Sequence, residues 1–98
     1  IMNANEYING MADLIRTTGA DVRIEDIDGR KRIAAKFHGV SEMNAEMKKA
    51  FIANAETLKA LNAGLKALRA SGEIKSATNC WAPTLLEGGI ELRMDFGF

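Results

Sequence analysis

The sequence predicts an α+β fold, a two-layer sandwich in which a short N-terminal helix and one long helix cover a four-stranded, mainly antiparallel sheet. Apolar residues recur at helical spacing near the N-terminus and again over residues 41–72, and two-residue alternation follows each of these segments. The element order is therefore α-β-β-α-β-β. Strands that alternate on one face need a cover on that face, which the two helices can supply. We expect one domain, residues 1–98.

The first helix is predicted to begin after Asn3, because Asn3 and Glu6 have the spacing of a capping box. The apolar residues that follow keep a spacing of three and four positions and so share one face. Gly19 is the expected stop. We also expect native translation to start at Met2, with Ile1 a remnant placed ahead of it.

A β-hairpin is predicted around Asp28-Gly29, which lies between two alternating runs. A two-residue turn at this point sets Ile24 opposite Ile33 and Val22 opposite Ala35 on one face. The same register places three pairs of opposite charge on the ladder, namely Asp21 with Lys36, Glu25 with Arg32 and Asp26 with Lys31. A shift by one residue would disrupt both sets, so the pattern specifies the register.

The long helix is expected between Ser41, a suitable N-cap, and Gly72, a suitable C-terminal stop. Asn54 interrupts its apolar face, so Asn54 either caps a second helix or fixes the packing of a single one. The helix formers around Asn54 favour a continuous or mildly bent helix. The residues assigned to the core face are Met43, Met47, Ala50, Phe51, Leu58, Leu61, Leu65 and Leu68.

Two further strands are predicted, from Glu73 to about Cys80 and from Gly89 to Phe98. The last strand has the most regular alternation in the chain, which favours an interior place in the sheet. Residues 81–89 between them are read as an apolar loop, because Pro83 prevents continuation as a central strand.

Composition excludes several classes of function. Thirteen basic residues balance 13 acidic ones, so no net field favours nucleic acid or an anionic membrane. The single cysteine, Cys80, rules out an internal disulfide and fits the reducing cytoplasm, where we expect the protein. No apolar run approaches the roughly 18 residues of a membrane span, and no signal peptide is evident.

No catalytic residue, cofactor or metal is predicted. His38 and Cys80 are the only candidates for a base and a nucleophile, and neither lies in a recognisable motif. One histidine and one cysteine cannot form a closed zinc site, and Gly88-Gly89 is better explained as a turn than as a phosphate loop. We therefore expect a protein that is not an enzyme.

Apolar residues outside the expected core point to protein binding. Trp81, Pro83, Leu85 and Leu86 lie on the predicted loop, where they could anchor a partner or fold back to close the core. Ile52 lies on the polar face of the long helix among alanines, and that face is either solvated or a strip that a partner helix approaches closely.

The leading hypothesis is a small non-enzymatic protein-binding module. It would act as an inhibitor of a partner protein complex and could form a homodimer. We expect no membrane partner. Its size and neutrality are those of many phage and mobile-element inhibitors of bacterial defence, such as anti-CRISPR proteins, by analogy of class alone. The alternative is a nucleic-acid-binding protein. It would contact phosphates through the hairpin tip and the helix lysines, namely Arg30, Lys31, Arg32, Lys48, Lys59 and Lys66.

Overall fold

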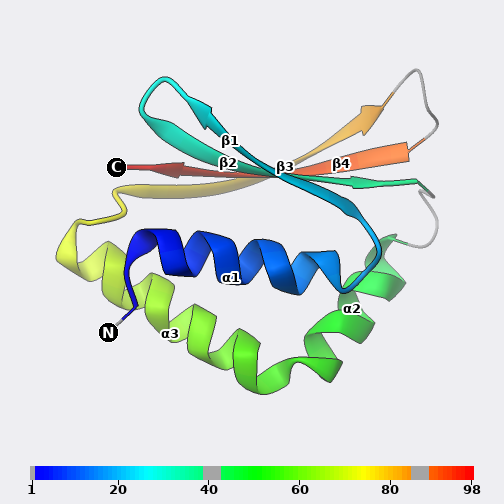
Figure 1. The fold of residues 1–98 in the computed structure, drawn as a ribbon, viewed down its shortest axis with the longest axis horizontal. Coiled ribbons are helices and arrows are strands. Elements are labelled where there is room, and N and C mark those ends of the chain that lie inside the picture. Colours follow the sequence, from blue (N-terminus) through cyan, green and yellow to red (C-terminus); the bar gives the residue numbers. More distant parts are fainter. Residues whose placement is uncertain (1, 39–42, 85–88) are drawn as a thin grey trace.

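The computed structural model describes residues 2–38, 43–84 and 89–98. Figure 1 shows a twisted sheet with the helices on one side of it, which confirms the predicted α+β architecture. The elements in chain order are α1 (Ala4–Arg16), β1 (Asp21–Ile27), β2 (Arg30–Phe37), α2 (Met43–Ala53), α3 (Ala55–Ser71), β3 (Ser76–Thr84) and β4 (Gly89–Gly97).

The sheet has the strand order β1-β2-β4-β3, and every neighbouring pair is antiparallel. The predicted hairpin is confirmed with its register, since Ile24 pairs with Ile33 and Glu25 with Arg32. Asp28 and Gly29 both have positive φ, 48° and 76°, as a two-residue type I′ turn requires. As predicted, the last strand is interior, because β4 pairs with β2 on one side and with β3 on the other.

β3 is longer than the sequence indicated and starts later. It begins at Ser76, not Glu73, and continues through Trp81 and Pro83 to Thr84, so the predicted loop begins inside a strand. The continuation is compatible with Pro83 because β3 lies at the edge of the sheet, where a residue without an N–H can be accommodated.

α1 supplies most of the helical contribution to the core. The predicted capping box is present, since the Glu6 N–H donates to Asn3 Oδ1 at 2.8 Å and the Asn3 N–H to Glu6 Oε1 at 3.1 Å. The Ala4 N–H also donates to Glu73 Oε2 at 2.7 Å, which ties the helix start to the segment before β3. Seven residues of α1 are buried, namely Ala4, Tyr7, Ile8, Met11, Ala12, Leu14 and Ile15.

The predicted long helix is two helices, and the expectation of a continuous or mildly bent one was wrong. Asn54 leaves the helical conformation, with φ −118° and ψ 34°, and it stands at the N-cap of α3. Its side chain makes no capping bond to α3 but turns back, with Nδ2 donating to the Ala50 carbonyl at 2.8 Å. Asn54 thus satisfies its amide on α2 while the chain changes direction, as Figure 1 shows.

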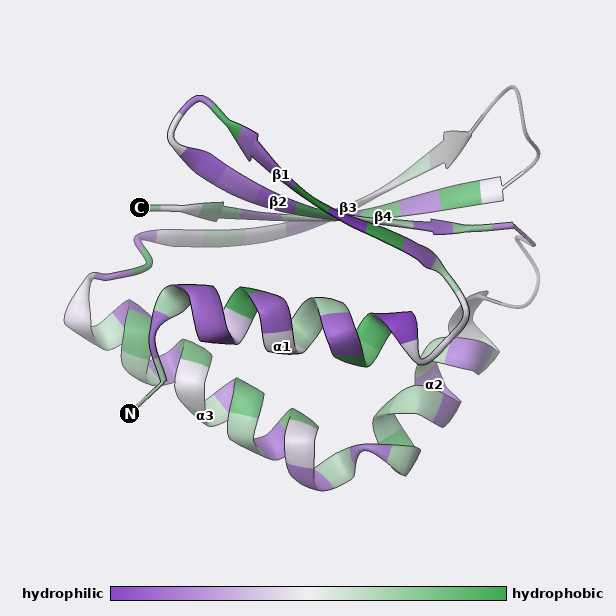
Figure 2. Ribbon diagram, in the orientation of Figure 1, coloured by the Kyte–Doolittle hydropathy of each residue, from purple (hydrophilic) through white to green (hydrophobic). Residues whose placement is uncertain are grey.

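Charged side chains form ion pairs on the outer face of the sheet, which the helices do not cover in Figure 1. Arg32 forms two hydrogen bonds with Asp95, at 2.7 and 3.2 Å. Glu91 accepts from Arg93 at 3.1 Å and lies 3.7 Å from Arg23. Neighbouring charges of opposite sign stabilise antiparallel strands, so this face needs no helix to cover it. Figure 2 shows the same division, with hydrophilic residues prominent on β1 and β2.

Candidate functional site: an apolar groove between the helices and β3–β4

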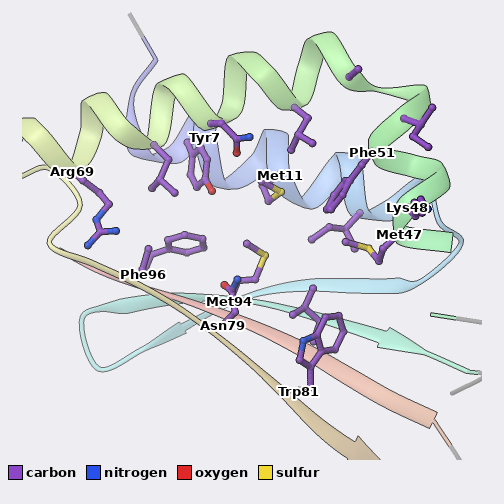
Figure 3. A pocket seen from close by; sticks show the side chains of 18 residues that line it. Tyr7, Met11, Met47, Lys48, Phe51, Arg69, Asn79, Trp81, Met94 and Phe96 are labelled. Atoms are coloured by element: carbon purple, nitrogen blue, oxygen red, sulfur yellow. The ribbon is translucent and has the colours of Figure 1, made fainter. Parts of the chain in front are cut away.

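An open groove of about 870 Å³ lies between the sheet and the helices (Figure 3). Its floor is the inner face of β3 and β4, its back wall is α1, and its roof is α2 with α3. The residues that line this groove are Tyr7, Met11, Ile15, Met47, Lys48, Phe51, Ile52, Ala55, Leu58, Asn62, Leu65, Arg69, Ala77, Asn79, Trp81, Leu92, Met94 and Phe96.

The groove exists because the helices cover only part of the sheet. α1 contacts β1 and β2, whereas α3 packs against α1. The two helices approach each other closely at Gly10, where an added Cβ would lie 2.9 Å from Leu61 Cδ2. From its C-terminal end near the sheet, α3 runs obliquely away toward α2 (Figure 1). On the inner face of β4, Leu92 and Phe96 are buried, but Met94 of β4 and Ala77 of β3 are only partly buried, so part of this face borders open space where a second helix could have packed.

The helix residues assigned to the core divide into two groups. Ala50, Leu61 and Leu68 are buried, as predicted. The structure leaves four others only partly buried and on the groove, namely Met47, Phe51, Leu58 and Leu65. The side chain of Met43 lies outside the described residues. Their place on a groove could not be predicted, because an apolar stripe has the same spacing whether it meets the sheet or an open groove.

The polar lining of the groove favours an occupant with negative charge. Lys48 is a residue of α2 and Arg69 lies in the last turn of α3, and they stand at opposite ends of the view in Figure 3. Among the described lining residues there is no carboxylate. Tyr7 is protonated at neutral pH and can donate a hydrogen bond, and burial raises the pKa of its hydroxyl further above the ordinary value.

Two large apolar side chains are exposed at the groove. Ile52 of α2 is 69% exposed and Trp81 of β3 is 45% exposed. The sequence analysis placed them in two separate candidate surfaces, and the structure brings both to one site. The Trp81 ring also contacts Phe37, with centroids 6.4 Å apart, so Trp81 joins the edge of the core and remains accessible. Leu85, Leu86 and the side chain of Pro83 lie outside the described residues.

The basic residues of the alternative hypothesis are spread over separate elements. β2 begins with Arg30, Lys31 and Arg32. The turn that joins β1 to β2 points away from the helices in Figure 1. The Arg32 guanidinium is engaged by Asp95, and Lys31 Nζ donates to Asn5 Oδ1 at 2.9 Å. Lys48 lines the groove, and Lys59 and Lys66 are exposed on α3.

His38 and Cys80 are not brought together. His38 Nε2 lies 2.9 Å from Asp21 Oδ2 at an exposed position just after β2, whereas Cys80 is exposed on β3, and β4 lies between the two strands. Within the described ranges, no group of three or more histidine, cysteine, aspartate or glutamate side chains could hold a metal ion. None of the helices in the described part of the chain is long and apolar enough to cross a membrane.

Comparisons of the chain with protein-family models, with curated proteins and with solved structures gave no match.

Proposed function

We propose that this protein is a non-enzymatic binding module that holds a segment of a partner protein in the groove. The observation that carries the proposal is the incompletely covered inner face of β3 and β4, where Ala77, Trp81 and Met94 are not buried and beside which Ile52 is exposed. Burying apolar side chains is worth about 25 cal/mol per Å² of apolar surface, so a partner that covers these residues gains free energy. Exposed apolar clusters of this kind are typical of interaction sites.

The chemistry of the lining indicates what the partner segment carries. An amphipathic helix places apolar side chains on one face and charged ones at its flanks, and such helices commonly bind in apolar grooves. Lys48 and Arg69 would attract carboxylates at the two ends of the segment. The proposed occupant is therefore an acidic amphipathic segment of another protein.

We infer that binding itself is the activity, in the manner of an inhibitor that occupies a surface its partner needs. This part of the proposal is supported by the small size and zero net charge of the chain and by the analogy with small inhibitors of protein complexes.

Affinity capture from cells that express the protein tests the proposal when it is combined with two matched variants. Ile52→Glu places a carboxylate at the groove, and Ala60→Glu places the same charge on an exposed position of α3 that does not line it. We expect Ile52→Glu to weaken binding of the captured protein about tenfold or more, which is about 1.4 kcal/mol, and Ala60→Glu to leave it unchanged.

Equal capture by both variants would contradict the proposal. Capture that nuclease treatment abolishes, and that falls steeply as salt is raised, would instead favour the nucleic-acid-binding alternative.

A further inference from the structure

We propose that two copies of this chain pair through their β3 strands, antiparallel and about a two-fold axis at Asn79, to form one eight-stranded sheet. β3 is an edge strand, so among the described residues no strand pairs with the outer side of its backbone. Unpaired edges attract other strands, because every second residue there points both its N–H and its C=O toward the open side. The inference concerns self-association and stands independently of the partner bound in the groove.

The two edges of the sheet differ in charge. β1, the other edge, carries Asp21, Arg23, Glu25 and Asp26 among its seven residues. β3, from Ser76 to Thr84, carries no charged residue in nine positions. Charged side chains are a common protection of an edge against pairing, and β3 lacks that protection. A dimer through β3 would leave only the two charged β1 strands at the ends of the joint sheet.

The β3 edge is also accessible. The molecule measures 39 × 33 × 15 Å along its principal axes. Figure 1 is viewed down the shortest axis and shows the four strands one behind another, so the strands follow one another along that axis. At about 4.8 Å spacing they span about 14 Å, nearly the whole of that dimension. The described helices thus extend little beyond the sheet in the direction in which a fifth strand would be added. The side chains from Thr78 to Trp81 are all exposed.

Side-chain size selects the register. Directly opposite residues in an antiparallel pair lie on the same face, and with the axis at Asn79 the Trp81 of each copy faces Ala77 of the other. The large indole then meets the smallest side chain on the inner face of β3, and Thr78 lies opposite Cys80 on the outer face. This register pairs residues 76–82 completely and ends before Pro83, whose missing N–H would interrupt a longer ladder.

The pairing would change the candidate site as well. Ala77, Asn79 and Trp81 belong to the floor of the groove, and the axis would set these floor residues of the two copies side by side. Two grooves would then become one continuous apolar channel across the dimer. Each copy is neutral, so no net repulsion opposes the association.

Sedimentation equilibrium of the purified chain tests the inference without any partner, so its outcome is separate from that of the proposed function. The wild type should have twice the mass of the chain. In the proposed register Thr78→Lys/Cys80→Lys sets like charges opposite one another, and Thr78→Lys/Cys80→Glu sets opposite charges at the same positions. We expect the first variant to raise the dimer dissociation constant at least tenfold and the second to remain a dimer.

A wild type that stays monomeric at every concentration would overturn the inference, whatever the variants do. Equal behaviour of the two variants would also overturn it, because it would show that residues 78 and 80 do not face each other across an axis at Asn79. Oxidative cross-linking gives a second measure of the register. Asn79→Cys/Cys80→Ser should form a disulfide-linked dimer, whereas Ser76→Cys/Cys80→Ser should not, since its thiols lie six positions apart, about 20 Å.

Discussion

At the residue scale, the pair of Arg32 and Asp95 is the best-defined charge interaction of the outer face. Their side chains are about 28% and 29% exposed, and the guanidinium contacts both carboxylate oxygens. The hydrogen bonds from Arg32 lower the pKa of Asp95 below its ordinary value of 3.8, and nearby Arg30 and Arg93 act in the same direction. The folded state therefore favours the ionised carboxylate.

A lowered carboxyl pKa has a defined effect on stability. The contribution of Asp95 is complete above the pKa of the unfolded chain, about 4, and is lost as the pH falls through the lower pKa of the folded state. We expect Asp95→Asn to reduce the free energy of unfolding at pH 7 by about 1 kcal/mol or less, and to matter less and less below pH 4. Urea unfolding of both proteins across this range measures the difference. A difference that grows on acidification would contradict this assignment.

The sequence predicted the residue pairs of the hairpin but not all of their interactions. Arg32 does lie opposite Glu25 in the ladder, as expected. Its guanidinium nevertheless binds Asp95 of β4, the neighbour on its other side, which is paired with Arg32 in the second ladder. Turn chemistry and alternation specify a local hairpin, whereas the order of strands distant in sequence depends on packing that alternation alone does not define.

At the scale of elements, the sequence allowed either a break at Asn54 or a continuous helix, and the continuous helix that we favoured was wrong. Local propensity favours helix on both sides of Asn54, and propensity is a weak guide when tertiary contacts compete with it. The buried residues of α3 are Leu61, near its middle, and Leu68, in its last turn. α3 packs on α1 through this part, while α2 turns toward the other end of α1. A single straight helix could not follow α1 in this way.

Two glycines give a matched test of how α3 packs. A Cβ at Gly10 would lie 2.9 Å from the buried Leu61, while a Cβ at Gly64 would lie 2.7 Å from the sulfur of Met2, a flexible side chain near the chain start. We expect Gly64→Ala to be neutral or to stabilise by up to about 1 kcal/mol through helix propensity. Gly10→Ala should cost about 1 kcal/mol or more through overpacking, as thermal unfolding would measure.

A double-mutant cycle identifies the cause of that loss. Gly10→Ala should cost less in a Leu61→Ala background, because the crowding atom is gone. The same cost in both backgrounds would show that α1 and α3 do not approach each other closely at Gly10.

At the scale of the whole molecule, the groove follows from an imbalance between sheet and helices. The sequence correctly predicted four strands and a cover of helices, with β3 shifted from its predicted bounds, and it identified Ile52 and Trp81 as candidate binding residues. It could not show that these positions share one site, because they lie about 30 residues apart and meet only through the direction that α3 takes. The predicted core stripe of the long helix was only partly right, because α3 packs on α1 through Leu61 and Leu68 and leaves Leu58 and Leu65 on the groove.

Photo-cross-linking in living cells tests most directly which surface of the protein binds a partner. A photoreactive phenylalanine analogue is placed either at Ile52, on the groove, or at Arg30, an exposed position by the β1–β2 turn. We predict a discrete protein adduct from position 52 and none from position 30. Adducts with protein or nucleic acid from position 30, with none from position 52, would contradict it.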